Sequence, residues 1–460
     1  MPVRERVLRR ATKLLVVVVA AFGCLGLVGL TLLVPSAPAH ADSIRDGEYW
    51  LSEYGIQKAW DVSKGAGVTV AVIDSGVNGS IADLKGTIAG GSDVSGAGQA
   101  DGQRPLGSEP VHGTLVATVL AGRGHNPDGS PVASGSAGSD GIVGVAPQAQ
   151  LLTVSTWLGS PNPAGRPDSD QIPAAVRWAV DHGAKVINMS LGSSSPDWPT
   201  SWDDAFLYAE QKDVVIVAAA GNRAAGNVQV GAPATIPGVL TVAGLDRHEH
   251  ASVDASSQGV SIGVSAPAEQ LLGGLPDGSY AQWEGSSGAT PIVAGVAALI
   301  RAKWPQMSAK QVINRIISTA KDAGAHGHDP IYGYGILDAG AALTANVPEA
   351  TANPLGSIAD WIRVHRRSAP ATAAPSPTGP AKAPAEDAPL PEATAPAPVA
   401  SADANPWPAV VVLGFGALIL AILGGGTWHV LRLRRAAVPE ADDGGETKSD
   451  VMEESSPEES

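Results

Sequence analysis

The chain has 460 residues, too many for one ordinary domain, and a net charge of −15. That charge argues against a nucleic-acid-binding protein, which needs a basic surface to neutralise phosphates. The single cysteine, Cys24, excludes an intramolecular disulfide framework. Apolar residues make up 44 % of the chain, enough for a sizeable core.

Residues 1–41 have the pattern of a secretory signal peptide. Five basic residues within the first 13 precede an apolar run from 14 to 34, and an A-x-A cleavage site ends at Ala41. The run is longer than a usual signal core, so an uncleaved signal anchor is the alternative. Either reading places the chain after Asp42 outside the cytoplasm. Cys24 has no lipobox before it and is interpreted as a small apolar residue of this segment.

Residues 42–347 read as an α/β domain, because short runs rich in Val and Ile alternate with helical patterns. This alternation predicts a doubly wound parallel sheet with helices on both faces and a site beyond the carboxyl ends of the strands. We expect strands at 68–73, 151–154, 186–189, 214–219, 239–242 and 260–264, and helices at 172–182, 202–211, 293–303 and 308–320, with Ser308 as an N-cap.

Two motifs place an aspartate and a histidine at the ends of these elements. Asp74 ends the strand VAVID, where an imidazole N–H is a suitable partner for a partly desolvated carboxylate. His112 opens an apolar helix in the motif HGTLVA, and Gly113 permits a close backbone approach. We interpret His112 as a general base and the paired histidines elsewhere (His248 with His250, His326 with His328) as surface loop residues rather than metal ligands.

Two further motifs provide an amide and a hydroxyl. Asn222 ends AAAGN, and Ser287 lies in GSSGATP, where Ser286 is a competing candidate. Pro291 is tolerated in the first turn of a helix, which predicts that Ser287 lies at a helix N-terminus. There the helix dipole favours developing negative charge, and the Asn222 amide can donate to an oxyanion.

These four motifs, in this order, resemble those of the subtilisin-like serine peptidases over roughly residues 49–343. The resemblance implies a serine endopeptidase with a triad of Asp74, His112 and Ser287, and with Asn222 in the oxyanion hole. It assigns Ser286 to the place of a threonine before the nucleophile. It also implies that substrate binds as an extended strand in a pocket with small-residue walls; no cofactor and no metal are expected. The residues implied for those walls are Ser190, Leu191, Gly192, Ala218, Ala219 and Ala220.

The chain departs from the family pattern in three places. Leu115 and Thr118 replace residues that are often His and Gly in the histidine helix. Gly288 replaces a larger apolar residue, from which we expect looser packing behind the nucleophile. Only about ten residues separate Ala41 from Leu51, too few for a folded propeptide, so we expect an enzyme that needs no processing.

The C-terminal part predicts a membrane tether. Residues 348–406 hold a basic segment and a Pro/Ala-rich linker, 407–431 a transmembrane helix, and 432–460 an acidic cytoplasmic tail. Three arginines follow the apolar stretch at once, which places this end in the cytoplasm. The segment 357–367 has the pattern of a short basic amphipathic helix that either docks onto the peptidase or an acidic partner, or stays solvated.

This domain order resembles the mycosins, membrane-anchored peptidases of type VII secretion systems. The resemblance implies cleavage of secreted substrates and stabilisation of the secretion membrane complex; a tethered subtilase without a secretion partner is the alternative. The rival class is a catalytically silent subtilisin fold with a structural role. The Gly-rich insertion at 122–141 bears on that rival, because it is long enough to occlude a site.

Overall fold

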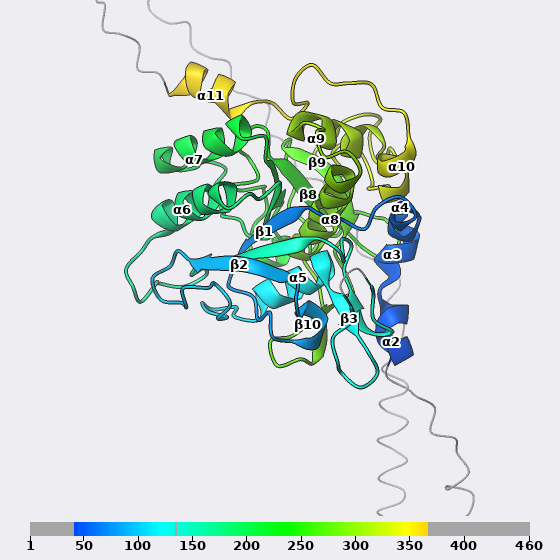
Figure 1. The fold of residues 1–460 in the computed structure, drawn as a ribbon. Helices are drawn as coiled ribbons and strands as arrows, with labels where there is room; N and C mark the ends of the chain where they lie inside the picture. Colours follow the sequence, from blue (N-terminus) through cyan, green and yellow to red (C-terminus); the bar gives the residue numbers. More distant parts are fainter. Residues whose placement is uncertain (1–40, 134–135, 367–460) are drawn as a thin grey trace, which may run out of the picture. The chain divides into compact units, whose positions relative to one another are not determined.

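Seven strands form a parallel sheet within residues 41–133 and 136–366, the part of the chain that the computed structural model describes (Figure 1). All described residues belong to one unit, Met1–Thr372. The strand order β2-β5-β1-β6-β7-β8-β9 places β1 where the direction of strand succession reverses. The strands are β1 (Thr69–Asp74), β2 (Ile88–Asp93), β5 (Gln150–Ser155), β6 (Val186–Met189), β7 (Val215–Ala219), β8 (Leu240–Leu245) and β9 (Ile262–Pro267).

The six strands predicted from Val- and Ile-rich runs are present; 186–189 has the predicted bounds, and the other five have shifted ends. The predicted start of the last one is wrong, because Val260 is 83 % exposed and β9 begins at Ile262. Sequence reasoning also missed β2, whose residues IAGGSD contain only one branched apolar side chain. This strand is held at the sheet edge by its parallel pairing with β5.

Helices cover both faces of the sheet, as predicted. Along β1, the side chains of Val70 and Val72 pack into one core cluster, while those of Ala71 and Ile73 pack into the other, because neighbouring side chains of a strand point to opposite faces. The first cluster includes α5 (His112–Ala121), α8 (Ser286–Lys303) and α9 (Ala309–Ser318); the second includes α6 (Asp168–Asp181) and α7 (Thr200–Gln211).

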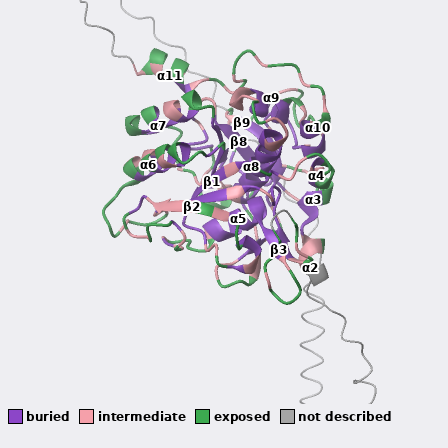
Figure 2. Cartoon of the chain, in the orientation of Figure 1, coloured by how far each residue is buried: buried purple, intermediate pink, exposed green. Residues whose placement is uncertain are grey.

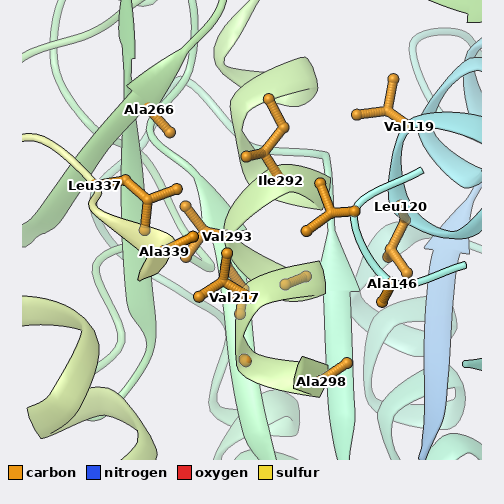
Figure 3. Packing of buried hydrophobic residues seen from close by; sticks show 14 of the residues in the cluster. Val119, Leu120, Ala146, Val217, Ala266, Ile292, Val293, Ala298, Leu337 and Ala339 are labelled. Carbon is orange, nitrogen blue, oxygen red and sulfur yellow. The ribbon is translucent and has the colours of Figure 1, made fainter. Parts of the chain in front are cut away.

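Helix α8 is the central helix of the fold. Figure 2 shows it buried, whereas α6 and α7 have exposed faces. Ile292, Val293 and Ala298 of α8 belong to the same buried cluster as Val217 of β7 (Figure 3), in agreement with the prediction of a buried helix here. Ser308 occupies the N-cap position of α9, but its side chain makes no capping bond; the Ala309 N–H donates to Asp213 Oδ1 instead (2.6 Å).

The N-terminal segment is part of the core. Trp50 and Ile56 are fully buried in the same cluster as α8. The remaining described elements are α2 (Ala41–Gly47), α3 (Tyr49–Glu53), α4 (Ile56–Trp60), η1 (Ala82–Leu84), β3 (Arg123–His125), β4 (Asp140–Val143), η2 (Arg223–Ala225), β10 (Leu271–Gly274), β11 (Tyr280–Trp283), α10 (Ala339–Thr344) and α11 (Ile358–His365).

Helix α11 corresponds to the predicted basic amphipathic helix, and it docks onto the domain. Ile358 is buried, and the Trp361 ring lies 4.4 Å from the ring of Trp198. Arg366 Nε donates to Asp203 Oδ2 at 2.9 Å. Of the two alternatives left open by the sequence, docking onto the peptidase domain is therefore the one observed.

Among the described residues, no helix is long and apolar enough to cross a membrane. The predicted signal segment up to residue 40, the linker after residue 366, the span at 407–431 and the tail at 432–460 lie outside the described residues.

Candidate active site

An imidazole and a carboxylate meet at the carboxyl end of β1. Asp74 is the last residue of β1 and His112 is the first residue of α5. His112 Nδ1 lies 2.8 Å from Asp74 Oδ1, and the Ser75 N–H donates to the same oxygen at 2.7 Å. The bond through Nδ1 leaves Nε2 as the ring nitrogen that is available to a reactant.

The surroundings of this pair explain the glycines of the motifs. A Cβ at Gly113 would lie 2.3 Å from Gly76 O, so the two loops approach only because residue 113 has no side chain. Thr118, which departs from the family pattern, has hydrogen-bond partners for its buried hydroxyl. The hydroxyl donates to Leu115 O and accepts from the Gly274 N–H. These departures from the motif leave the imidazole–carboxylate contact intact.

Two opposing effects act on the protonation of His112: burial of its ring and the nearby carboxylates. Burial of the ring disfavours the charged form, but the Asp74 carboxylate, through its charge and hydrogen bond, outweighs this effect. The Glu109 carboxylate adds to the attraction, and the pKa of His112 is raised above 6.5. The ring therefore binds a proton more readily than a free imidazole does.

Hydrogen bonds to Asn222 distinguish the two candidate serines. The Ser286 N–H and hydroxyl both lie within reach of Asn222 Oδ1, at 2.8 and 2.9 Å, and Ser286 is fully buried. Because Oδ1 is engaged by a backbone donor, the amide orientation is fixed and Nδ2 remains as a donor. Ser287 instead lies beside the open cleft.

Ser287 is the second residue of α8, at the helix N-terminus as predicted. Its hydroxyl donates to Ser190 O at 3.2 Å, and the Ser190 hydroxyl donates to Ser287 O at 2.7 Å. The prediction that Pro291 lies in the first turn is wrong, because it is the sixth residue of α8. The expected loose packing at Gly288 is also wrong, since a Cβ there would lie 2.3 Å from Leu271 Cδ1.

One cleft of about 250 Å³ brings most of the predicted site together. Ala218 and Ala220 do not line it: both are buried in the core on the α6/α7 face, because alternate residues of β7 and its continuation point to opposite faces. The predicted residues that line the cleft are Asp74, His112, Ser190, Leu191, Gly192, Ala219, Asn222 and Ser287.

The cleft also has lining residues that the sequence did not single out. Glu109 precedes His112 by one turn, and Asp168 is the first residue of α6. Partial burial raises the pKa of Asp168. Together with Asp74 they give the cleft three carboxylates, and no Lys or Arg is among its described lining residues. Asp168 reaches the cleft only through the fold, whereas Glu109 lies three residues before His112 in the sequence, outside the motif that begins at the histidine.

A second histidine–aspartate pair lies apart from this cleft. His125 Nδ1 lies 2.7 Å from Asp83 Oδ1, and the Ile142 N–H donates to Asp83 Oδ2. Beside it, Glu48 accepts from the Val143 N–H at 2.9 Å. These contacts tie η1 to β3 and β4 and the N-terminal segment to β4; the two strands lie at the two ends of the Gly-rich insertion.

The described residues of that insertion do not contribute to the cleft lining. Instead, β3 and β4 pair as a small antiparallel sheet. Among the described residues, no group of three or more His, Cys, Asp or Glu is placed to hold a metal ion.

The chain is similar to a known protein family and to several known proteins. Residues 65–335 match the family described as Subtilase family. Mycosin-4 of Mycobacterium tuberculosis (strain ATCC 25618 / H37Rv) is 33 % identical over 357 residues, which cover 68 % of this chain and 73 % of that protein. Fervidolysin of Fervidobacterium pennivorans is 33 % identical over 334 residues, 65 % of this chain but only 44 % of its own length.

A solved structure shows the same fold. The MycP3 protease from the type VII (ESX-3) secretion system superposes with a TM-score of 0.53 at 30 % identity, over 68 % of this chain and 91 % of that one.

Proposed function

The chain belongs to the subtilase family and is a serine endopeptidase, and we propose that Asp74, His112 and Ser287 are its catalytic triad. The observation that carries the proposal is the single cleft that holds all three residues and Asn222. Carboxylate, imidazole, hydroxyl and amide are the groups that acyl transfer through a serine requires.

The proposed reaction begins when the Ser287 hydroxyl leaves its bond to Ser190 O and turns to His112 Nε2. His112 takes the hydroxyl proton while Oγ attacks the substrate carbonyl carbon. Asn222 Nδ2 and the Ser287 N–H, which lies in the first turn of α8 without an intrahelical acceptor, stabilise the resulting oxyanion.

Collapse of this intermediate breaks the peptide bond, and His112 passes its proton to the leaving amine. Water then hydrolyses the acyl-enzyme by the same route, with His112 again as the base. Throughout, Asp74 holds the imidazole in the required tautomer and stabilises its charged form.

The substrate in this proposal is an extended peptide that lies along Ser190, Leu191 and Gly192. Main-chain hydrogen bonds to this segment contribute affinity without regard to sequence. Ala219 on the opposite wall leaves room for a side chain beside Ser287.

We further propose that the enzyme acts outside the cytoplasm, anchored by one helix at 407–431, as a mycosin of a type VII secretion system. The basis is the sequence of the two ends and the similarity to mycosin-4 and to MycP3. In this role it processes secreted substrates and stabilises the membrane complex.

Topology and role are tested in cells. With Cys24 replaced by serine, a cysteine at exposed Val228 should react with an impermeant maleimide in intact cells, and one at Ser455 only after permeabilisation. Secretion in a deletion strain should be restored by the wild type. Full restoration of secretion by Ser287→Ala would favour the structural role over substrate processing. Equal labelling of both cysteines in intact cells would contradict the proposed topology.

A further inference from the structure

A proline interrupts the hydrogen bonding of α8 behind the proposed nucleophile. In an α-helix, the carbonyl of residue 287 accepts the N–H of residue 291. Residue 291 is proline and has no N–H, so Ser287 O loses its helical donor. A carbonyl left without a donor next to the reacting atom would cost stability and allow the first turn of the helix to shift.

The Ser190 hydroxyl takes the place of the missing donor. It lies 2.7 Å from Ser287 O, although the two residues are 97 positions apart in sequence. Ser190 is 3 % exposed, so water does not compete freely for this bond. The hydroxyl is the direct substitute for the N–H that Pro291 lacks.

Asn188 fixes the direction of this hydroxyl. Its Nδ2 donates to Ser190 Oγ at 3.0 Å from a fully buried position on β6. Because Oγ accepts there, its own proton is directed to Ser287 O. A hydrogen-bond chain therefore runs from the buried sheet, through Ser190, to the backbone of the nucleophile.

We infer that Ser190 is a positioning residue, whose side chain holds the backbone of Ser287 in the attacking geometry in place of the helical bond excluded by Pro291. This role is separate from any main-chain contact of Ser190 with substrate, and it rests on the proposed role of Ser287. It acts through another residue, so it should affect the reactivity of Ser287 more than the binding of peptides.

The test is a double-mutant cycle on the full-length chain, with the rate of fluorophosphonate labelling as the readout. Ser190→Ala removes the donor and should slow labelling about tenfold. Pro291→Ala supplies an N–H at the right position and should label at close to the wild-type rate. In the double variant that N–H replaces the lost hydroxyl. The double variant should therefore label less than about threefold more slowly than Pro291→Ala alone.

Ser193→Ala is the matched control, because Ser193 lies in the same segment and its hydroxyl bonds only to local backbone at Ser195. It should label as the wild type does. With a peptide substrate, Ser190→Ala should lower kcat and leave KM within about twofold, whereas lost substrate binding would raise KM.

Two results would overturn the inference: an unchanged labelling rate in Ser190→Ala, or the same slowing with and without Pro291→Ala. A folded wild type that does not label at all would instead overturn the proposed role of Ser287, so the two failures are distinguishable.

Discussion

The two histidine–aspartate pairs of this protein have nearly the same geometry. In both, Nδ1 and Oδ1 are 2.7–2.8 Å apart, the aspartate side chain is 2 % exposed and the histidine side chain 17–18 % exposed. The two pairs differ in the residues that surround the histidine ring. His112 faces a cleft with Ser287 and Asn222, whereas His125 joins β3 to η1, beside the Glu48 bond that holds the N-terminal segment to β4. The comparison teaches that the pair alone does not define a catalytic site; its neighbours do.

Removal of each carboxylate should separate the two pairs most clearly. Asp74→Asn should lower kcat by roughly 10⁴-fold, because His112 loses the partner that fixes its tautomer. Asp83→Asn should leave kcat per folded molecule within about twofold, but lower the free energy of unfolding by about 1–3 kcal/mol, since the buried Asp83 carboxylate accepts hydrogen bonds from His125 and from the Ile142 N–H. Peptide hydrolysis and urea unfolding measure the two effects.

The pH dependence of the same variants provides the control. Activity needs neutral His112 as the base, so kcat/KM of the wild type should rise with pH through a pKa above 6.5. Asp83→Asn should keep this inflection unchanged. A shift of the inflection by Asp83→Asn, or equal losses of activity in both variants, would show that the two pairs are not functionally distinct.

Asn222→Ala tests the proposed oxyanion donor, whose amide lies in the same cleft as Asp74 and His112. The expected loss in kcat is about 10² to 10³, the size found when one oxyanion donor is removed from subtilisin. KM should change little, because the donor acts on charge that develops in the transition state. Asn227 also lines the cleft and offers a comparison variant, since we assign it no role in the oxyanion hole. An Asn222→Ala loss that appears in KM alone would refute the assignment.

Much of the fold follows from local patterns, and so do the positions of the triad candidates. Apolar runs mark the central strands, and the motif residues lie at strand and helix ends where the chain reverses. The misses have physical causes. Strand β2 is sustained by pairing with β5 rather than by its own composition, and Asp168 joins the lining of the cleft only through the fold. The error at Ala218 and Ala220 comes from treating three successive residues as one wall, although side chains alternate across a strand.

The second pair has an acidic neighbour whose titration should change stability. Burial raises the pKa of Glu48 to about 8, although the Arg45 guanidinium opposes this shift. The folded state then binds a proton that the unfolded chain releases near pH 4.5, so Glu48 should lower the free energy of unfolding as pH rises from about 4.5 to 8. Glu48→Gln should remove this dependence, with a gain over the wild type of a few kcal/mol by pH 8.

Urea unfolding of wild type and Glu48→Gln between pH 5 and 9 measures this effect. The activity profile should stay the same, because Glu48 does not line the cleft. Parallel stability curves for the two proteins would contradict the assigned titration.

The smallest expected effect concerns the charge of the catalytic cleft. Its carboxylates and its lack of described Lys or Arg lining residues should favour peptides with basic over acidic side chains near the cut bond. Glu109→Gln should reduce that preference about two- to fivefold, on the scale of one partly screened charge pair. Asp140→Asn, a carboxylate change near the second pair, is the control and should leave the preference unchanged. Competition between matched Lys and Glu peptides at low salt measures it; an unaltered ratio in Glu109→Gln would contradict the prediction.

The most direct test of the catalytic assignment is fluorophosphonate labelling of the purified full-length chain, with the modified residue identified by mass spectrometry. We expect an adduct on Ser287, its complete loss in Ser287→Ala, and slower labelling at the same residue in Ser286→Ala, which removes the hydroxyl bond to Asn222 Oδ1 and keeps the backbone bond. A folded wild-type protein without an adduct, or an adduct that persists on another serine in Ser287→Ala, would contradict it.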